Sequence, residues 1–144
     1  MFEFRKSVGF NIEISESQKS MLSSPKKINE ALQNENVIAF DIYFDNYLVG
    51  FAMLRKYEED EFKRSSYFLW DYAINYKYQN HGYGIKALRQ LLILLKENYK
   101  AKNVTTTYIY GNEHAKYIYE KIGFVETDIV DEDDVHEVNM LIEL

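Results

Sequence analysis

The stretch LWDYAINYKYQNHGYGIKALRQLLILLKE, residues 69–97, contains three successive patterns that decide the fold. Residues 69–74 form a short apolar run, which predicts a buried strand. Residues 78–84 are polar and include two glycines, which predicts a turn. From Ile85 onward apolar side chains recur at helical spacing as far as Leu95. The predicted order is strand, glycine turn and helix.

A glycine turn before a helix suits an anionic ligand. The first turn of a helix leaves backbone N–H groups without partners and carries positive partial charge, and glycines let a phosphate approach the backbone. A tight turn with no ligand is the alternative interpretation. The chain lacks both G-x-x-x-x-G-K-[ST] and G-x-G-x-x-G, so the turn is neither a P-loop nor a dinucleotide fingerprint. The remaining pattern is Gln79-x-x-Gly82-x-Gly84.

A second block follows this helix. Residues 104–110 are β-branched and aromatic, which predicts a strand. Asn112 can cap a helix over residues 113–122, which places apolar residues on one face. Gly123 ends that helix, and Phe124-Val125 begins another strand.

Together the two blocks resemble the GNAT-type N-acetyltransferase superfamily, and within it most closely the bacterial spermine/spermidine acetyltransferases. The pattern is Gln79-x-x-Gly82-x-Gly84 followed by Asn112-x-x-Ala115-x-x-x-Tyr119-x-x-x-Gly123-Phe124. The resemblance is strong over residues 70–125 and weak before residue 37. It implies an α+β fold with a mixed, mostly antiparallel central sheet flanked by helices, in which the central strands splay apart.

The resemblance also implies acetyl-CoA as the cofactor. The end of the strand before the turn would offer backbone groups to the cofactor arm, and the turn and first helical amides would hold the pyrophosphate. Asn112 would hydrogen-bond the arm, a role that is compatible with capping. The implied cofactor-binding residues are Ala73, Ile74, Asn75, Gln79, Asn80, His81, Gly82, Tyr83, Gly84, Ile85 and Asn112.

Tyr119 is the candidate catalytic acid. A thiol has a pKa near ~8.5 and a phenol near ~10, so a phenol is protonated at neutral pH and can donate to a leaving thiolate. The alternative is core packing, because Tyr119 shares an apolar helical face with Ala115 and Ile122. The resemblance favours the acid role.

The base that deprotonates the amine is left open among three carboxylates. An ammonium with a pKa of ~10.4 must lose a proton, and a carboxylate can take it through water. The candidates are Asp71, Asp41 and Asp60. The three histidines lack the spacing of a metal site, and no metal is expected.

Length and composition narrow the class of protein. The 144 residues predict a single acetyltransferase-like domain over residues 1–144. With no cysteine, the chain has no disulfide and no cysteine nucleophile. A net charge of −6 argues against nucleic-acid binding. No apolar run of spanning length occurs, so we expect no membrane partner and a cytoplasmic location. The sequence leaves a homodimer open.

The N-terminal third predicts a strand, a helix and a hairpin. Residues 1–7 suit a first strand, and the alternation of apolar residues over 8–24 allows another. Ser24-Pro25 predicts a helix start. Residues 37–44 and 47–55 predict strands joined by an Asp45-Asn46 turn. Gly50, inside the second of these strands, predicts a bulge or a close backbone approach.

Two charged segments are assigned to loops. Residues 56–66 suit a solvated loop, with a rim above the acceptor site as the alternative. Residues 129–135 contain four acids and predict an exposed turn before a last strand over 136–144.

The resulting hypothesis is an acetyl-CoA-dependent N-acetyltransferase that acetylates a primary amine of a small molecule, with a polyamine such as spermidine or spermine as a candidate. Two alternatives stay open. One is a non-catalytic acyl-CoA-binding or sensing module on the same fold, and the other is a protein or peptide N-acetyltransferase.

Overall fold

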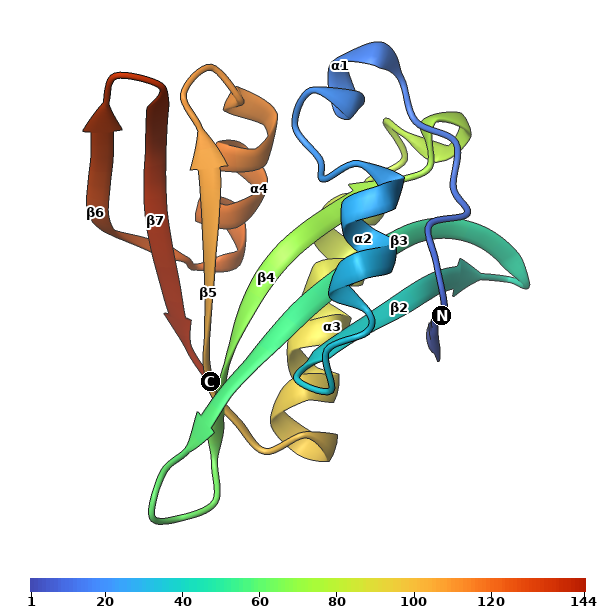
Figure 1. Ribbon diagram of the computed structural model, residues 1–144. Helices are drawn as coiled ribbons and strands as arrows, with labels where there is room; N and C mark the ends of the chain where they lie inside the picture. The colour runs from blue at the N-terminus through green and yellow to red at the C-terminus, as the bar shows by residue number, and fades with distance from the viewer.

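Seven strands form one sheet in the order β1-β2-β3-β4-β5-β7-β6, with helices on both faces (Figure 1). The computed structural model describes residues 1–144. Only the β4–β5 pair is parallel, which confirms the mixed, mostly antiparallel sheet. The strands are β1 (Phe2–Lys6), β2 (Val37–Phe44), β3 (Tyr47–Glu59), β4 (Ser65–Ile74), β5 (Ala101–Ile109), β6 (Val125–Glu132) and β7 (Val135–Glu143). The helices are α1 (Glu16–Lys19), α2 (Pro25–Ala31), the 3₁₀ turn η1 (Tyr76–Tyr78), α3 (Tyr83–Asn98) and α4 (Glu113–Ile122).

Each face of the sheet has its own hydrophobic core. The larger core lies under α3 and α4 and contains the predicted leucine face of α3, Leu88, Leu91, Leu92 and Leu95. The smaller core lies under α2, where Ile28 packs with Phe51 and Met53. In Figure 1 α2 lies in front of the sheet and α3 behind it. None of the helices has the length and apolar character that a membrane span requires.

The predicted β2–β3 hairpin is confirmed. Asp45 and Asn46 form its turn with φ values of 49° and 68°, the positive values of a type I′ turn. Ile42 pairs with Gly50 and Tyr43 with Leu48, so one residue between them is bulged. A Cβ on Gly50 would lie 3.0 Å from the carbonyl oxygen of Ala73, so both predictions for this glycine hold.

The segment before α2 differs from the prediction. Residues 8–14 form no strand, and the short helix α1 follows them. A capping box starts α1, in which the Ser15 side chain accepts from the N–H of Gln18 and the Gln18 side chain accepts from the N–H of Ser15. The start of α2 is as predicted, with Ser24 as N-cap and Pro25 in the first turn.

Both segments assigned to loops are largely strands. β3 continues to Glu59, where it pairs with Ser65, so only a tight turn separates β3 from β4. β6 continues to Glu132 and pairs there with Val135. The assignment holds only for the turns at residues 60–64 and 133–134, because the flanking strand residues satisfy their backbone by pairing while their charged side chains stay in solvent.

β4 and β5 separate partway along their length. Their pairing runs from Ser65 opposite Ala101 to Leu69 opposite Thr106, and neither strand pairs with the other beyond that point. β4 nevertheless continues to Ile74 and β5 to Ile109. The expected splay of the central strands is therefore confirmed.

Candidate active site

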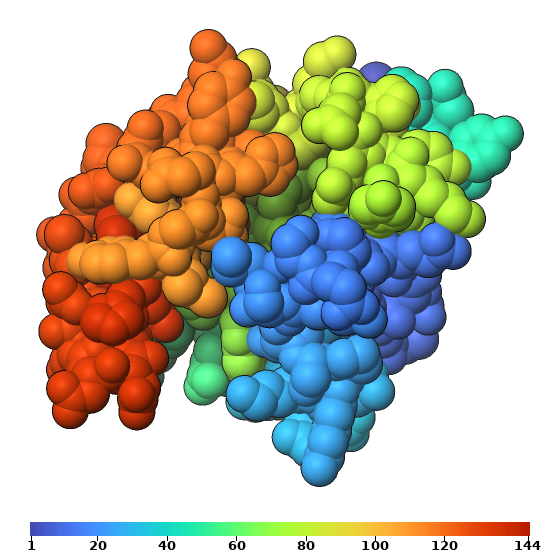
Figure 2. Space-filling model, turned by 90° about the horizontal axis from the view of Figure 1, so that it is seen from above, coloured from blue at the N-terminus to red at the C-terminus, as the bar shows by residue number.

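The gap between the splayed strands opens into a cleft of about 820 Å³. Its walls come from the ends of β4 and β5, the turn before α3, the first half of α4, and the α1 segment. Figure 2 shows a hollow between the orange residues around α4, the blue residues around α1, and the yellow-green turn after β4. Segments that are far apart in the sequence thus share one site.

The end of β4 contributes two of the three residues expected there. Ala73 and Ile74 line the cleft. Asn75 does not, because its N–H donates to Val49 at 2.7 Å and its side-chain oxygen caps η1. Asn75 therefore ties the end of β4 to β3, and its N–H is not available to a ligand.

The glycine turn places an uncapped helix end at the cleft. Gly82 is the N-cap of α3 with φ 76°, and no side chain caps this helix. Side-chain oxygens cap α1, α2, η1 and α4 instead. The first-turn N–H groups of α3 therefore lack the side-chain acceptor that every other helix has. The expected residues of the turn that line the cleft are Gln79, Asn80, Gly82, Tyr83, Gly84 and Ile85.

Glycine is favoured at the two positions of the turn for different structural reasons. Gly82 needs a positive φ, and a Cβ there would meet nothing closer than Lys86 Cε at 4.0 Å. A Cβ on Gly84 would lie 3.1 Å from Ile118 Cδ1, so Gly84 lets α3 pack closely against α4. The Tyr72 hydroxyl donates to the Gly84 carbonyl at 2.6 Å and fixes this turn to β4.

The histidines occupy three different settings. His81 does not line the cleft, and its Nδ1 lies 2.7 Å from the Gln79 carbonyl oxygen, within the turn. His114 is exposed, as expected, but it also lines the cleft. His136 lies in β7 next to Asp131. No metal-binding cluster of His, Asp and Glu occurs.

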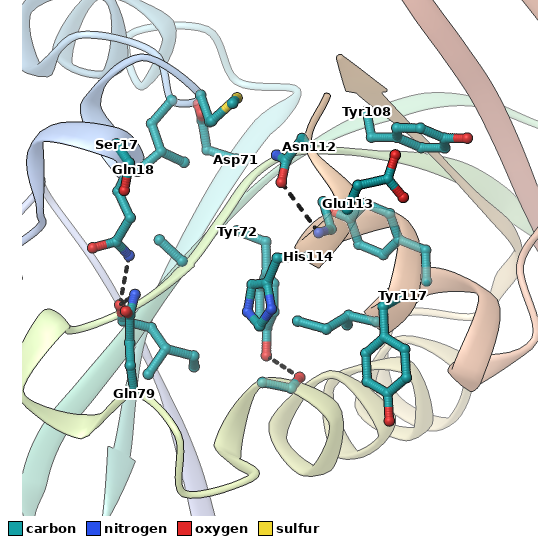
Figure 3. A pocket seen from close by; sticks show the side chains of 18 of the residues that line it. Ser17, Gln18, Asp71, Tyr72, Gln79, Tyr108, Asn112, Glu113, His114 and Tyr117 are labelled. Carbon is teal, nitrogen blue, oxygen red and sulfur yellow. Dashed lines mark hydrogen bonds between the residues drawn. The ribbon is translucent and has the colours of Figure 1, made fainter. Parts of the chain in front are cut away.

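Asn112 lies at the cleft on the opposite wall from the turn. Its side-chain oxygen accepts from Ala115 N at 3.2 Å, as the capping prediction requires. The amide nitrogen of the same side chain has no protein partner among the hydrogen bonds of the chain and remains able to donate. Figure 3 shows Asn112, Glu113, His114 and Tyr117 on this wall, facing Gln18 and Gln79.

Tyr119 lines the cleft and is also a core residue. It is 7% exposed, and its ring packs against Phe124 with centroids 5.4 Å apart. Burial raises the pKa of its phenol, and the negative charge of the Asp71 carboxylate adds to this rise. The phenol therefore keeps its proton at neutral pH, which an acid requires.

The structure separates the three candidate bases. Asp60 lies in the β3–β4 turn, away from the cleft, where it accepts from the backbone N–H groups of Phe62 and Arg64. Asp41 lies in β2 and also does not line the cleft. Asp71 alone of the three is a cleft residue. None of residues 56–66 lines it, so the alternative of an acceptor-site rim there is wrong.

Sequence reasoning missed the wall formed by the α1 segment. This wall consists of Ser17, Gln18, Met21 and Leu22. Gln18 Nε2 donates to the Ile74 carbonyl at 2.9 Å, which attaches α1 to the end of β4 (Figure 3). The Ser15-x-x-Gln18 capping box is a sequence signal that could have located this helix.

The charges of the cleft wall have one sign. Asp71 and Glu113 line it, and no lysine or arginine does. Aromatic side chains accompany the carboxylates; Tyr108, for example, donates from its hydroxyl to Glu126 at 3.0 Å. Carboxylates and aromatic faces both favour a cationic ligand.

Comparisons with known proteins agree on one family. The profile described as the Acetyltransferase (GNAT) family matches residues 9–124. A spermine/spermidine N(1)-acetyltransferase of Bacillus subtilis is 31% identical over 118 residues, which is 79% of this chain and 77% of that protein. A [ribosomal protein bS18]-alanine N-acetyltransferase of Haemophilus influenzae is 32% identical over 99 residues, 67% of this chain and 61% of that protein.

The fold is shared with a solved structure. A GNAT family acetyltransferase from Elizabethkingia anophelis, crystallised with acetyl-CoA bound, superposes with a TM-score of 0.72 at 18% identity and covers 99% of this chain and 98% of that chain. The sheet, the splayed strands and the glycine turn thus occur together with a family profile that spans most of the sequence. The chain therefore belongs to the GNAT family of acetyltransferases, enzymes that use acetyl-CoA.

Proposed function

We propose that this chain is an acetyl-CoA-dependent N-acetyltransferase that acetylates a primary amine of a small cationic molecule, with spermidine and spermine as the first candidates. The observation that carries this proposal is the cleft between β4 and β5. It joins the uncapped end of α3, the buried phenol of Tyr119 and a wall without lysine or arginine. We infer that residues 1–144 act as one catalytic domain.

Three features of the cleft support the proposed binding of the cofactor there. The N–H groups at the start of α3 would hold the pyrophosphate, because they lack a capping side chain and Gly82 presents no Cβ. The free amide nitrogen of Asn112 would donate to the extended arm. Ile74 would accept from the arm through the carbonyl oxygen that Gln18 now contacts.

Acetyl-CoA supplies an activated acetyl thioester when bound. Tyr119 would then move a proton, since its phenol keeps that proton at neutral pH and lies beside the cleft. Its Oη would donate to the sulfur as the C–S bond breaks, and it would regain a proton from the new ammonium nitrogen or from water.

The carboxylates favour an amine that carries a positive charge. With Asp71 and Glu113 as its charged wall residues, the cleft attracts cations and disfavours anionic acceptors. The Bacillus subtilis relative, named for spermine and spermidine, is consistent with this reading.

A protein N-terminus is the second candidate acceptor, because the Haemophilus influenzae relative is named for a ribosomal-protein alanine. We place it second because the relative is covered less completely. A non-catalytic acyl-CoA sensor is disfavoured by the buried tyrosine in the cleft, which binding alone does not require.

Two measurements test the proposed function. A thermal-shift screen of acyl-CoAs should show stabilisation by acetyl-CoA, and a thiol-release assay should then rank spermidine, spermine, simple monoamines and a peptide with an N-terminal alanine. Release with a polyamine well above the monoamines supports the proposal. Stabilisation by acetyl-CoA without release for any amine supports the sensor, and release with the peptide alone supports protein acetylation.

A further inference from the structure

Asp71 owes its position to an irregularity in β4. Met53 pairs with Asp71 and Leu54 pairs with Leu69, so Trp70 has no partner on β3 and forms a bulge. Tyr67 and Leu69, before the bulge, pack in the core under α3. Since side chains alternate along a strand, a regular β4 would turn Asp71 toward that same apolar core.

The bulge instead turns Asp71 toward the α1 and α2 side. Ala73, two residues further on, packs in the core under α2. The Asp71 Oδ1 atom accepts from Ser23 N at 2.9 Å, in the segment between α1 and α2. The strand irregularity thus places a carboxylate at the cleft, against the wall formed by the α1 segment.

One oxygen of this carboxylate has no partner. Asp71 is 3% exposed, and its Oδ2 atom is buried without a hydrogen bond. No ion pair in the chain involves Asp71. A buried carboxylate oxygen without a partner is costly to the folded protein, and burial accordingly raises the pKa of Asp71.

The unpaired oxygen lies near the groups assigned to the reaction. Asp71 lies just beyond Leu69, where β4 separates from β5, and Tyr119 lies in α4 at the same cleft. Both residues line the same cleft, where no lysine or arginine competes for the carboxylate. A ligand with an N–H donor and a positive charge would complete the hydrogen bonding of Oδ2.

We propose that Asp71 Oδ2 is the binding point for the ammonium group of the acceptor, and that Asp71 makes the enzyme select cationic amines. This inference rests on the proposed function for the reaction, but it concerns binding and can be tested without turnover. The Ser23 N–H occupies Oδ1, which leaves Oδ2 as the oxygen that lacks a partner and could accept from a ligand. Asp71 is a specificity-determining residue in this account.

The test compares Asp71→Asn with the wild type by calorimetric titration of spermidine, with and without coenzyme A. Asparagine keeps an oxygen for Ser23 N–H and removes the charge, so the spermidine dissociation constant should rise about 10- to 100-fold. Affinity for acetyl-CoA and melting temperature should not fall. If Asp71→Asn does not fold, Asp71→Ser also removes the charge and gives the same comparison.

Asp41→Asn is the matched control. Asp41 also has a buried oxygen without a partner, but it does not line the cleft. Spermidine affinity should be unchanged in this variant. Glu113→Gln should have a smaller effect than Asp71→Asn, because Glu113 is exposed at the cleft.

Three results would overturn the inference: no spermidine binding by the wild type, unchanged affinity in Asp71→Asn, or an equal loss in Glu113→Gln. Failure of the proposed function looks different. Spermidine binding that depends on Asp71 without any acetylation contradicts only the proposed reaction. Spermidine acetylation with the same KM in Asp71→Asn contradicts only the role of Asp71.

Discussion

Replacing Tyr119 with phenylalanine separates the two roles that its position allows. The substitution removes one hydroxyl and keeps the ring that packs against Phe124. If the hydroxyl donates to the leaving sulfur, kcat should fall by roughly 10²–10⁴, the usual contribution of a positioned acid. Affinity for acetyl-CoA should change little, because the proton is needed mainly in the transition state.

The stability change should be small. The substitution removes a single hydroxyl and leaves the packed ring in place, a change that usually costs no more than about 1.5 kcal/mol. For a chain of this length that corresponds to a drop in melting temperature of less than about 6 °C. Tyr119→Ala opens a cavity beside Phe124 and should cost about 3–5 kcal/mol.

The assay measures thiol release at saturating acetyl-CoA with the best amine of the panel, and melting temperature on the same preparations. A Tyr119→Phe enzyme with near wild-type kcat would refute the acid role and leave Tyr119 as a core residue. A low kcat together with a collapsed melting temperature would also contradict the reasoning, since the ring was expected to keep the fold intact.

Three further perturbations follow from the structure. Gly82→Ala should weaken acetyl-CoA binding at least tenfold in calorimetry, since it places a side chain at the proposed pyrophosphate site. Gly123→Ala, at another glycine with a positive φ but outside the cleft, should leave the affinity unchanged, and equal affinities in the two variants would contradict the pyrophosphate assignment. Burial raises the pKa of Asp41 in the folded protein. At pH values between its ordinary pKa and this raised pKa, the native state therefore binds more protons than the unfolded state, so the free energy of unfolding should fall as the pH rises through this range. Asp41→Asn should therefore raise the melting temperature at pH 7, with a smaller gain near pH 4, and an equal gain at both pH values would count against this account. Gly50→Ala places a Cβ 3.0 Å from the carbonyl oxygen of Ala73 and should lower the free energy of unfolding by about 1–3 kcal/mol. Urea denaturation measures this change, and an unchanged denaturation midpoint would mean that β4 moves aside without cost.

Local chemistry in the sequence was enough for several elements. The Asp45-Asn46 turn, the Ser24-Pro25 helix start and the Asn112 cap each depend on residues within a few positions of one another. Such signals survive in any tertiary context, because the turn or cap is satisfied by its own neighbours. The periodic leucines predicted α3 because their spacing gives the helix one apolar face, which packs on the sheet.

Local sequence signals gave the wrong prediction where pairing with a distant strand determined the structure. The acids of residues 131–132 suit a turn, yet β7 supplies backbone partners that hold them in β6. Likewise β3 extends to Glu59 because β4 pairs with it. In both strands the charged side chains stay in water while the backbone pairs, so pairing outweighs propensity at these positions.

The candidate site was only partly contained in the sequence. Spacing and resemblance identified the glycine turn, Asn112 and Tyr119, and these line the cleft except for His81 of the turn. The sequence has no marker for the bulge at Trp70, because a bulge follows from how β4 pairs with β3. That one extra residue turns Asp71 from the α3 side to the cleft wall, so only the tertiary structure decided which of the three candidate carboxylates lines the cleft.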